Sequence, residues 1–75
     1  MRLAARAREQ TGLSQREFAR LIGVRSQSTV ARWETTNSRT HIAPTGPARA
    51  LLVLIEAHPD LCTEVLRNLP EARDD

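Results

Sequence analysis

The apolar residues of this chain recur at the three- and four-residue spacing of helices, in five short stretches. Glycine, proline and small polar residues separate the stretches, and none of them shows the strict alternation of a half-buried strand. The pattern predicts an all-α fold of five helices. The stretches are residues 3–10, 15–22, 27–35, a fourth that begins at Gly46-Pro47 and ends at His58-Pro59-Asp60, and residues 60–68.

The second and third stretches carry the clearest helix boundaries. Ser14 and Glu17 have the spacing of a capping box, in which each residue satisfies a free amide of the other at the start of a helix. Gly23 suits the left-handed residue that ends a helix. Ser26 is the better N-cap for the third helix, and Ser28 is a weaker candidate. Two helices joined by a short turn are therefore expected here, with an exposed loop over residues 35–45 after them.

The same spacing predicts which side chains of the helices are buried. Val30 and Trp33 lie three residues apart, so they share one face of the third helix and are expected to point inward. The fourth helix is expected to turn a stripe of Leu51, Leu54, Ile55 and His58 toward the core. The expected core residues are Phe18, Leu21, Val30, Trp33, Leu51, Leu54 and Ile55.

The residues opposite this inward face carry polar chemistry that suits DNA bases. If the second and third helices cross steeply, the outward side chains of the third helix are those before Val30 and opposite Trp33. Gln pairs with adenine, Arg with guanine, Ser with either edge, and the Ala methyl group packs on thymine. The predicted base-contacting residues are Gln27, Ser28, Ala31 and Arg32.

Charge is divided between the two ends of the chain. Residues 1–50 contain nine Arg and three acidic residues, whereas residues 51–75 contain two Arg and six acidic residues. A basic half is expected where a surface meets a polyanion, although a merely solvated surface is the alternative interpretation. Amide groups at the start of a helix also bind phosphate. The predicted phosphate contacts are Ser14, Gln15, Arg16, Arg20, Arg25 and Arg39.

Other classes of site find little support in the sequence. Cys62 is the single cysteine, and neither His41 nor His58 has ligand-like spacing to it, so no metal and no cofactor are expected. No nucleophile has a base at catalytic spacing, so the chain is not expected to be an enzyme. No apolar run reaches membrane-spanning length and no leader opens the chain, which makes a cytoplasmic, nucleoid-associated protein the expectation.

The stretch GLSQREFARLIGV, followed by STVARWE, resembles the helix-turn-helix of the Cro/CI (XRE-type) family of bacterial and phage regulators. The resemblance covers residues 3–58 and implies a lambda-repressor-like domain. By this resemblance Gln15 would hold phosphate and brace the recognition helix, while the outward residues of the third helix would contact bases. The matching positions are Ala19, Gly23, Val30, Trp33 and Glu34.

Two departures from the family pattern bear on this expectation. Six residues separate Gly23 from Val30, one more than usual, and we place the extra residue in the turn near Arg25. The family's glycine after the third helix is replaced by Thr36, and the loop of residues 35–45 is longer than usual. This loop carries Arg39 and His41, which could reach the DNA backbone, another protomer, or nothing.

The sequence thus predicts one helix-turn-helix domain over residues 1–70, with the motif at about 14–34, C-terminal helices at 46–69 and a frayed tail at 71–75. The leading interpretation is a sequence-specific, autoregulatory repressor that binds inverted-repeat double-stranded DNA as a homodimer. The alternatives are an antitoxin that also binds a partner toxin and an architectural DNA binder without sequence preference. The residues expected at the dimer contact are Leu61, Val65, Leu66 and Leu69.

Overall fold

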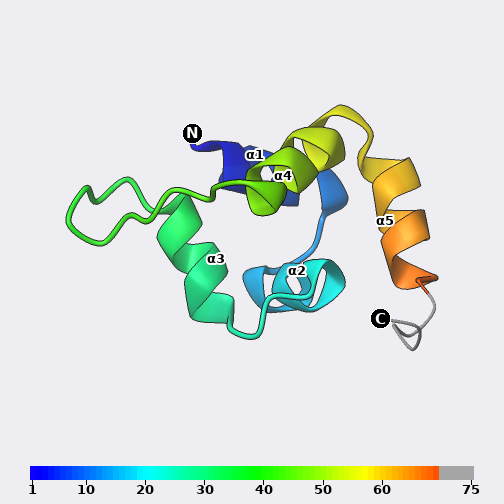
Figure 1. Cartoon of the computed structure of the whole chain (residues 1–75), viewed down its shortest axis with the longest axis horizontal. Coiled ribbons are helices and arrows are strands. Elements are labelled where there is room, and N and C mark those ends of the chain that lie inside the picture. Colours follow the sequence, from blue (N-terminus) through cyan, green and yellow to red (C-terminus); the bar gives the residue numbers. More distant parts are fainter. Residues whose placement is uncertain (70–75) are drawn as a thin grey trace.

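The computed structural model describes residues 1–69 and contains five helices (Figure 1). No strand occurs in this part of the chain, so the predicted all-α fold is confirmed. The predicted frayed tail at 71–75 lies outside the described residues. The helices are α1 (Leu3–Thr11), α2 (Gln15–Ile22), α3 (Gln27–Glu34), α4 (Pro47–Ala57) and α5 (Pro59–Arg67).

Helix α1 lies at the centre of the arrangement. It packs against α4 most extensively and also contacts α3 and α5, while α2 packs against α3 and α5. Helices α3 and α5 lie at opposite sides of the molecule, and the loop of residues 35–46 projects beyond α3 (Figure 1). The loop after α3 therefore forms one end of the molecule, and α5 forms the other.

The core is built from aliphatic side chains, one phenylalanine and one tryptophan. Three alanines of α1 are buried, and their small side chains allow α4 to approach α1 closely. Phe18, Val30, Leu52 and Ile55 are the largest fully enclosed side chains. The buried residues that form one cluster are Ala4, Ala7, Phe18, Ala19, Val30, Trp33, Leu52 and Ile55.

The predicted inward stripe of α4 was wrong at two positions. Leu54 is 55% exposed and His58 is exposed, whereas Leu52 is fully buried together with Ile55. Because α4 is apolar on almost every side, its sequence does not distinguish one apolar face from another. The contact with α1 determines which face of α4 is buried, and that face carries Leu52 and Ile55.

Candidate nucleic-acid interface

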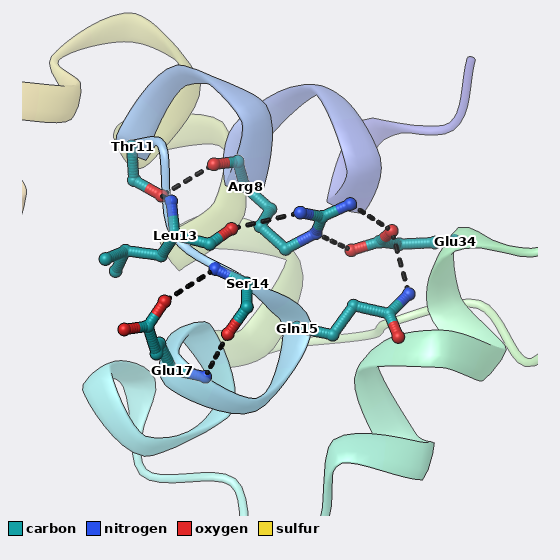
Figure 2. Close-up of polar contacts among 7 residues, drawn as sticks. All are labelled: Arg8, Thr11, Leu13, Ser14, Gln15, Glu17 and Glu34. Carbon is teal, nitrogen blue, oxygen red and sulfur yellow. Dashed lines mark hydrogen bonds and ion pairs between the residues drawn. The ribbon is translucent and has the colours of Figure 1, made fainter.

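The start of α2 is held by a complete capping box (Figure 2). The Ser14 N–H donates to Oε1 of Glu17 at 3.0 Å, and the Glu17 N–H donates to Oγ of Ser14 at 3.1 Å. Because the bond from the backbone N–H favours the ionised carboxylate, it lowers the pKa of Glu17 below its usual value, and the Ser14 hydroxyl adds to this effect. The predicted start of the second helix is confirmed.

The turn after α2 closes with a left-handed glycine. Gly23 has φ 82°, and its N–H donates to the carbonyl of Arg20 at 3.4 Å. The next N–H, from Val24, donates to the carbonyl of Ala19 at 2.9 Å, which completes the paired bonds of a Schellman motif. The Val24 side chain then packs against the core, so the direction in which the chain leaves α2 is fixed.

Helix α3 begins at Gln27, where the sequence predicted it. The Ser26 Oγ accepts the Ser28 N–H at 3.1 Å, so Ser26 is the N-cap. This start agrees with a placement of the extra residue in the turn before Ser26, near Arg25, which stays a prediction. This start sets the rotational position of every side chain on α3.

The outward face of α3 is polar and contains no acidic side chain. Val30 and Trp33 are buried, which directs the opposite side of the helix to solvent. Gln27, Ser28 and Arg32 are exposed and Ala31 is half-buried. The four residues predicted to contact bases therefore share an accessible surface, and their contact with bases stays a prediction.

A polar network ties the end of α3 to α1 and α2 (Figure 2). Nε of Arg8 donates to Oε2 of Glu34 at 2.7 Å, and Nη2 of Arg8 donates to Oε1 at 3.0 Å. Nε2 of Gln15 donates to the same Oε1 at 3.1 Å. The hydrogen bonds to Glu34 raise the pKa of the Arg8 guanidinium above its usual value. Helix α3 is thereby connected to both neighbouring helices through one carboxylate.

Sequence reasoning missed Arg8, because it lies 26 residues from Glu34 and only the packing of α1 against α3 brings them together. The bracing of α3 by Gln15, which the family resemblance implied, is present. Since an amide nitrogen carries two hydrogens and Glu34 accepts one, the Gln15 side chain keeps a second donor. That donor is compatible with the predicted phosphate contact.

Three of the predicted phosphate-binding arginines surround one surface hollow. A hollow of about 410 Å³ lies between α2 and the start of α3, and Arg16, Arg20 and Arg25 line it without any acidic residue. All three are exposed, and within residues 1–69 none of them forms an ion pair. The start of α3, with Ser26 and Gln27, lies at the same hollow. The hollow therefore combines positive charge with polar donors next to α3.

Comparison with known proteins agrees with this geometry. A family model described as a helix-turn-helix domain matches residues 2–65. The chain belongs to the helix-turn-helix domain family. It is therefore a DNA-binding protein of the kind that regulates transcription. No similar curated protein and no similar solved structure was found.

The loop that follows the helix-turn-helix is internally bonded. The Arg39 N–H donates to Oδ1 of Asn37 at 3.0 Å, and the His41 N–H donates to the Asn37 carbonyl at 2.9 Å. At its base, the Ile42 N–H donates to the carbonyl of Arg32 at 3.1 Å. Arg39 is exposed on this loop and lies apart from the hollow lined by the other arginines.

Helix α5 lies on the side of the molecule opposite α3 and packs against α2 and α4 (Figure 1). Leu61, Val65 and Leu69 are more than half exposed, as is Leu54 of α4. We call the hollow between α4 and α5 the α4–α5 groove, and its volume is about 240 Å³. Its lining is entirely apolar and consists of Leu51, Leu54, Leu61, Cys62, Val65 and Leu66.

Three of the four residues predicted at the dimer contact thus lie on an exposed apolar surface, while Leu66 packs partly against the core. Sequence reasoning missed the contribution of Leu54 to this surface, because it assigned that residue to the core. No helix of the described chain, residues 1–69, is long and apolar enough to cross a membrane.

Proposed function

We propose that this helix-turn-helix protein is a sequence-specific transcriptional repressor that binds DNA as a homodimer. The observation that carries the proposal is the outward face of α3, which is exposed, polar and free of acidic side chains. A helix that only had to remain soluble would not need to exclude acidic residues. Acidic side chains on a helix inserted in the major groove would be repelled by the DNA phosphates and would weaken the complex.

In this proposal the first residues of α3 enter the major groove. The exposed Gln27, Ser28 and Arg32 donate to or accept from base edges, and Ala31 contacts a thymine methyl group. The caps at Gly23 and Ser26 and the Glu34 network hold these side chains in one orientation. A fixed orientation favours specificity, because the helix need not be ordered when it binds.

The phosphate contacts flank this helix. Ser14, Gln15 and Arg16 lie at the start of α2, and Arg20 and Arg25 lie at the hollow between α2 and α3. Such contacts position the protein and supply affinity that depends on salt, but they carry no sequence information. Removing a base contact and removing a phosphate contact are therefore expected to change DNA affinity in different ways.

The homodimer is supported by the exposed apolar residues of α4 and α5. One helix-turn-helix module makes few base contacts, so high specific affinity requires two copies on an inverted repeat, with half-sites about 34 Å or one helical turn apart. Repression would follow from occlusion of a promoter, with autoregulation of the chain's own operon as the simplest scheme. The proposed location is the cytoplasm, at the nucleoid, and the proposal includes no cofactor and no catalytic step.

The test is a gel-shift titration with the region upstream of the chain's own operon and with an unrelated duplex of equal length. The proposal expects binding to the upstream region that is at least about 10³-fold tighter than to the unrelated duplex. Equal affinity for both duplexes would indicate an architectural binder, and absence of binding would exclude any role on this DNA.

Two arginine variants separate base contact from phosphate contact. Arg32→Ala should lose specific affinity by about 1–3 kcal/mol with little change on the unrelated duplex, because it removes a base contact. Arg16→Ala should weaken both complexes alike and reduce the salt slope by about one. Arg6→Ala removes the same charge from a side chain of α1 that pairs with Glu56 of α4, away from α2 and α3, and serves as the control. If the first two variants behave alike, the assignment of Arg32 is wrong.

A second candidate function is an antitoxin that binds a partner toxin as well as its operator. The α4–α5 groove supports it, since an apolar surface of this kind suits a protein partner. A small basic reading frame beside the gene, whose product forms a stable complex with this chain in co-expression, would favour the antitoxin. A chain that saturates its operator as a homodimer without such a neighbour favours the repressor.

A further inference from the structure

A further surface hollow lies where the start of α1, the base of the loop of residues 35–46 and the start of α4 meet. Its volume is about 210 Å³. Trp33, on the inner side of α3, contributes to its lining, and we call it the Trp33 hollow. It is separate from the hollow lined by Arg16, Arg20 and Arg25, with which it shares no residue.

Three basic side chains and no acidic one line the Trp33 hollow. They are Arg2, His41 and Arg49, from three different segments of the chain. Nε of Arg2 donates to the carbonyl of Thr35 at 2.8 Å, which holds this guanidinium in place. Within residues 1–69 its two Nη groups form no hydrogen bond, and the side chains of His41 and Arg49 form neither a hydrogen bond nor an ion pair. The hollow therefore offers several donors for an anion.

The rest of the lining is apolar and includes Leu3, Pro44 and Trp33. Small-molecule sites commonly combine such a wall with a few polar groups that fix the orientation of the ligand. A bare inorganic anion would leave the apolar wall in contact with water, whereas an organic anion would cover it. Because drug-sized ligands occupy about 300–1,000 Å³, the volume of the Trp33 hollow selects a smaller molecule.

We propose that the Trp33 hollow binds a small organic carboxylate with a planar apolar body. The guanidinium groups of Arg2 and Arg49 bind the carboxylate through charge-assisted hydrogen bonds, and the apolar body packs against Pro44 and Trp33. Since Arg2 also bonds the carbonyl of Thr35, the residue that ends α3, the ligand site is connected directly to that helix. The inference goes beyond the proposed function, because it gives the protein a site for a small effector apart from its DNA interface.

The experiment titrates the nitrogen-labelled full chain, without DNA, with benzoate, benzamide and acetate, and follows the amide NMR spectrum. Benzamide has the shape of benzoate without its charge, and acetate has the charge without the ring. Benzoate should bind at least about tenfold more tightly than either, because only benzoate uses both parts of the hollow. Its largest shifts should fall on residues of the Trp33 hollow such as His41 and Ala43. At ten times its Kd, benzoate should raise the unfolding temperature by about 5 °C or more.

Variants assign the binding to the Trp33 hollow. Arg49 is exposed and unpaired within residues 1–69, so Arg49→Ala should fold with an unchanged unfolding temperature in the absence of ligand. Its affinity for benzoate should fall about tenfold or more. Arg67→Ala removes the same charge from α5, outside this hollow, and should bind benzoate like the wild type.

The inference is overturned by any of four results. Benzoate does not bind, acetate binds as tightly as benzoate, Arg49→Ala retains the wild-type affinity, or the largest shifts fall on Arg16, Arg20 and Arg25. The second and fourth results would indicate attraction of any anion to a basic surface. Because these titrations contain no DNA and the gel-shift test contains no benzoate, failure of this inference is distinguishable from failure of the proposed function.

Discussion

The Glu34 carboxylate accepts hydrogen bonds from two other helices, through Arg8 of α1 and Gln15 of α2. The side chains of Glu34 and Arg8 are 9% and 21% exposed, so water competes weakly for their bonds. A second Arg–Glu pair, Arg6 with Glu56, has a similar N–O distance of 2.6 Å but side chains that are 44% and 34% exposed. The two pairs differ in burial and also in the number of hydrogen bonds, since Arg8 donates twice to Glu34 whereas Arg6 donates once to Glu56.

Replacing Glu34 by glutamine should lower the free energy of unfolding by about 1.5–3 kcal/mol, because a half-buried guanidinium loses its charged partner. Glu56→Gln should lower it by less than about 1 kcal/mol, because solvent screens the exposed pair. Urea denaturation of the two variants measures both values. Equal losses would show that the network around Glu34 has no special role in stability.

At the same scale, the sequence predicted the accessible face of α3 but not its anchor. The face followed from local features, namely the Ser26 cap and the three-residue spacing of Val30 and Trp33. The anchor depends on Arg8, and no local pattern distinguishes that arginine from the others of residues 1–10. Only the way α1 packs against α3 distinguishes it.

At the scale of helices, boundaries were predictable because capping is local, and burial was predictable only where a helix has one apolar face. The ends of α2 and the start of α3 follow from Ser14, Gly23 and Ser26, which act within four residues. Helix α4 is apolar on most sides, so the burial of Leu52 and the exposure of Leu54 depend on which side α1 covers. The α4–α5 groove was unpredictable for the same reason.

Substitutions of Gly23, in the turn between α2 and α3, should lower the stability of the protein through backbone strain and not through steric overlap. Gly23 has φ 82°, and a Cβ built at this position meets no other heavy atom within 4 Å. Gly23→Ala should therefore destabilise the protein by about 1–2 kcal/mol through backbone strain. Gly23→Asn should cost less, because asparagine tolerates the left-handed region. Thermal unfolding of the two variants tests this order, and an equal loss in both would point to a steric cause.

The capping box of α2 predicts a pH dependence. Since hydrogen bonds from Ser14 lower the pKa of Glu17, its ionised form stabilises the folded state above the unfolded pKa. That contribution is lost as the pH falls through the lowered pKa of the folded state. The stability difference between the wild type and Glu17→Gln should thus be largest near neutral pH and should disappear on acidification. Urea denaturation at several pH values measures it, and a constant difference would contradict the assignment.

At the scale of the whole molecule, two surfaces of different chemistry lie apart. The arginine-lined hollow and the loop adjoin α3, whereas the exposed apolar residues belong to α5, on the side of the molecule opposite α3, and to α4, which packs against α5 (Figure 1). Acidic residues accompany the apolar surface, since α5 contains Asp60 and Glu64. This separation would allow the protein to bind DNA and a second copy at the same time.

Val65→Glu tests the second surface. Val65 is 51% exposed and does not belong to the buried core, so the variant should fold while a carboxylate on the apolar surface opposes self-association. Sedimentation should show a monomer, and affinity for a two-half-site operator should fall about 10²-fold or more. Glu64→Gln changes charge at the neighbouring position and should leave the dimer intact. An unchanged sedimentation coefficient for Val65→Glu would place the dimer contact elsewhere.

Trp33 gives α3 an optical signal of its own. It is the single tryptophan, the chain contains no tyrosine, and the side chain is buried where α3 meets α1 and the base of the loop. The near-ultraviolet emission of the unlabelled protein therefore originates at one position. Because that position lies directly behind the surface proposed to contact bases, fluorescence can follow both unfolding and DNA docking without an attached dye.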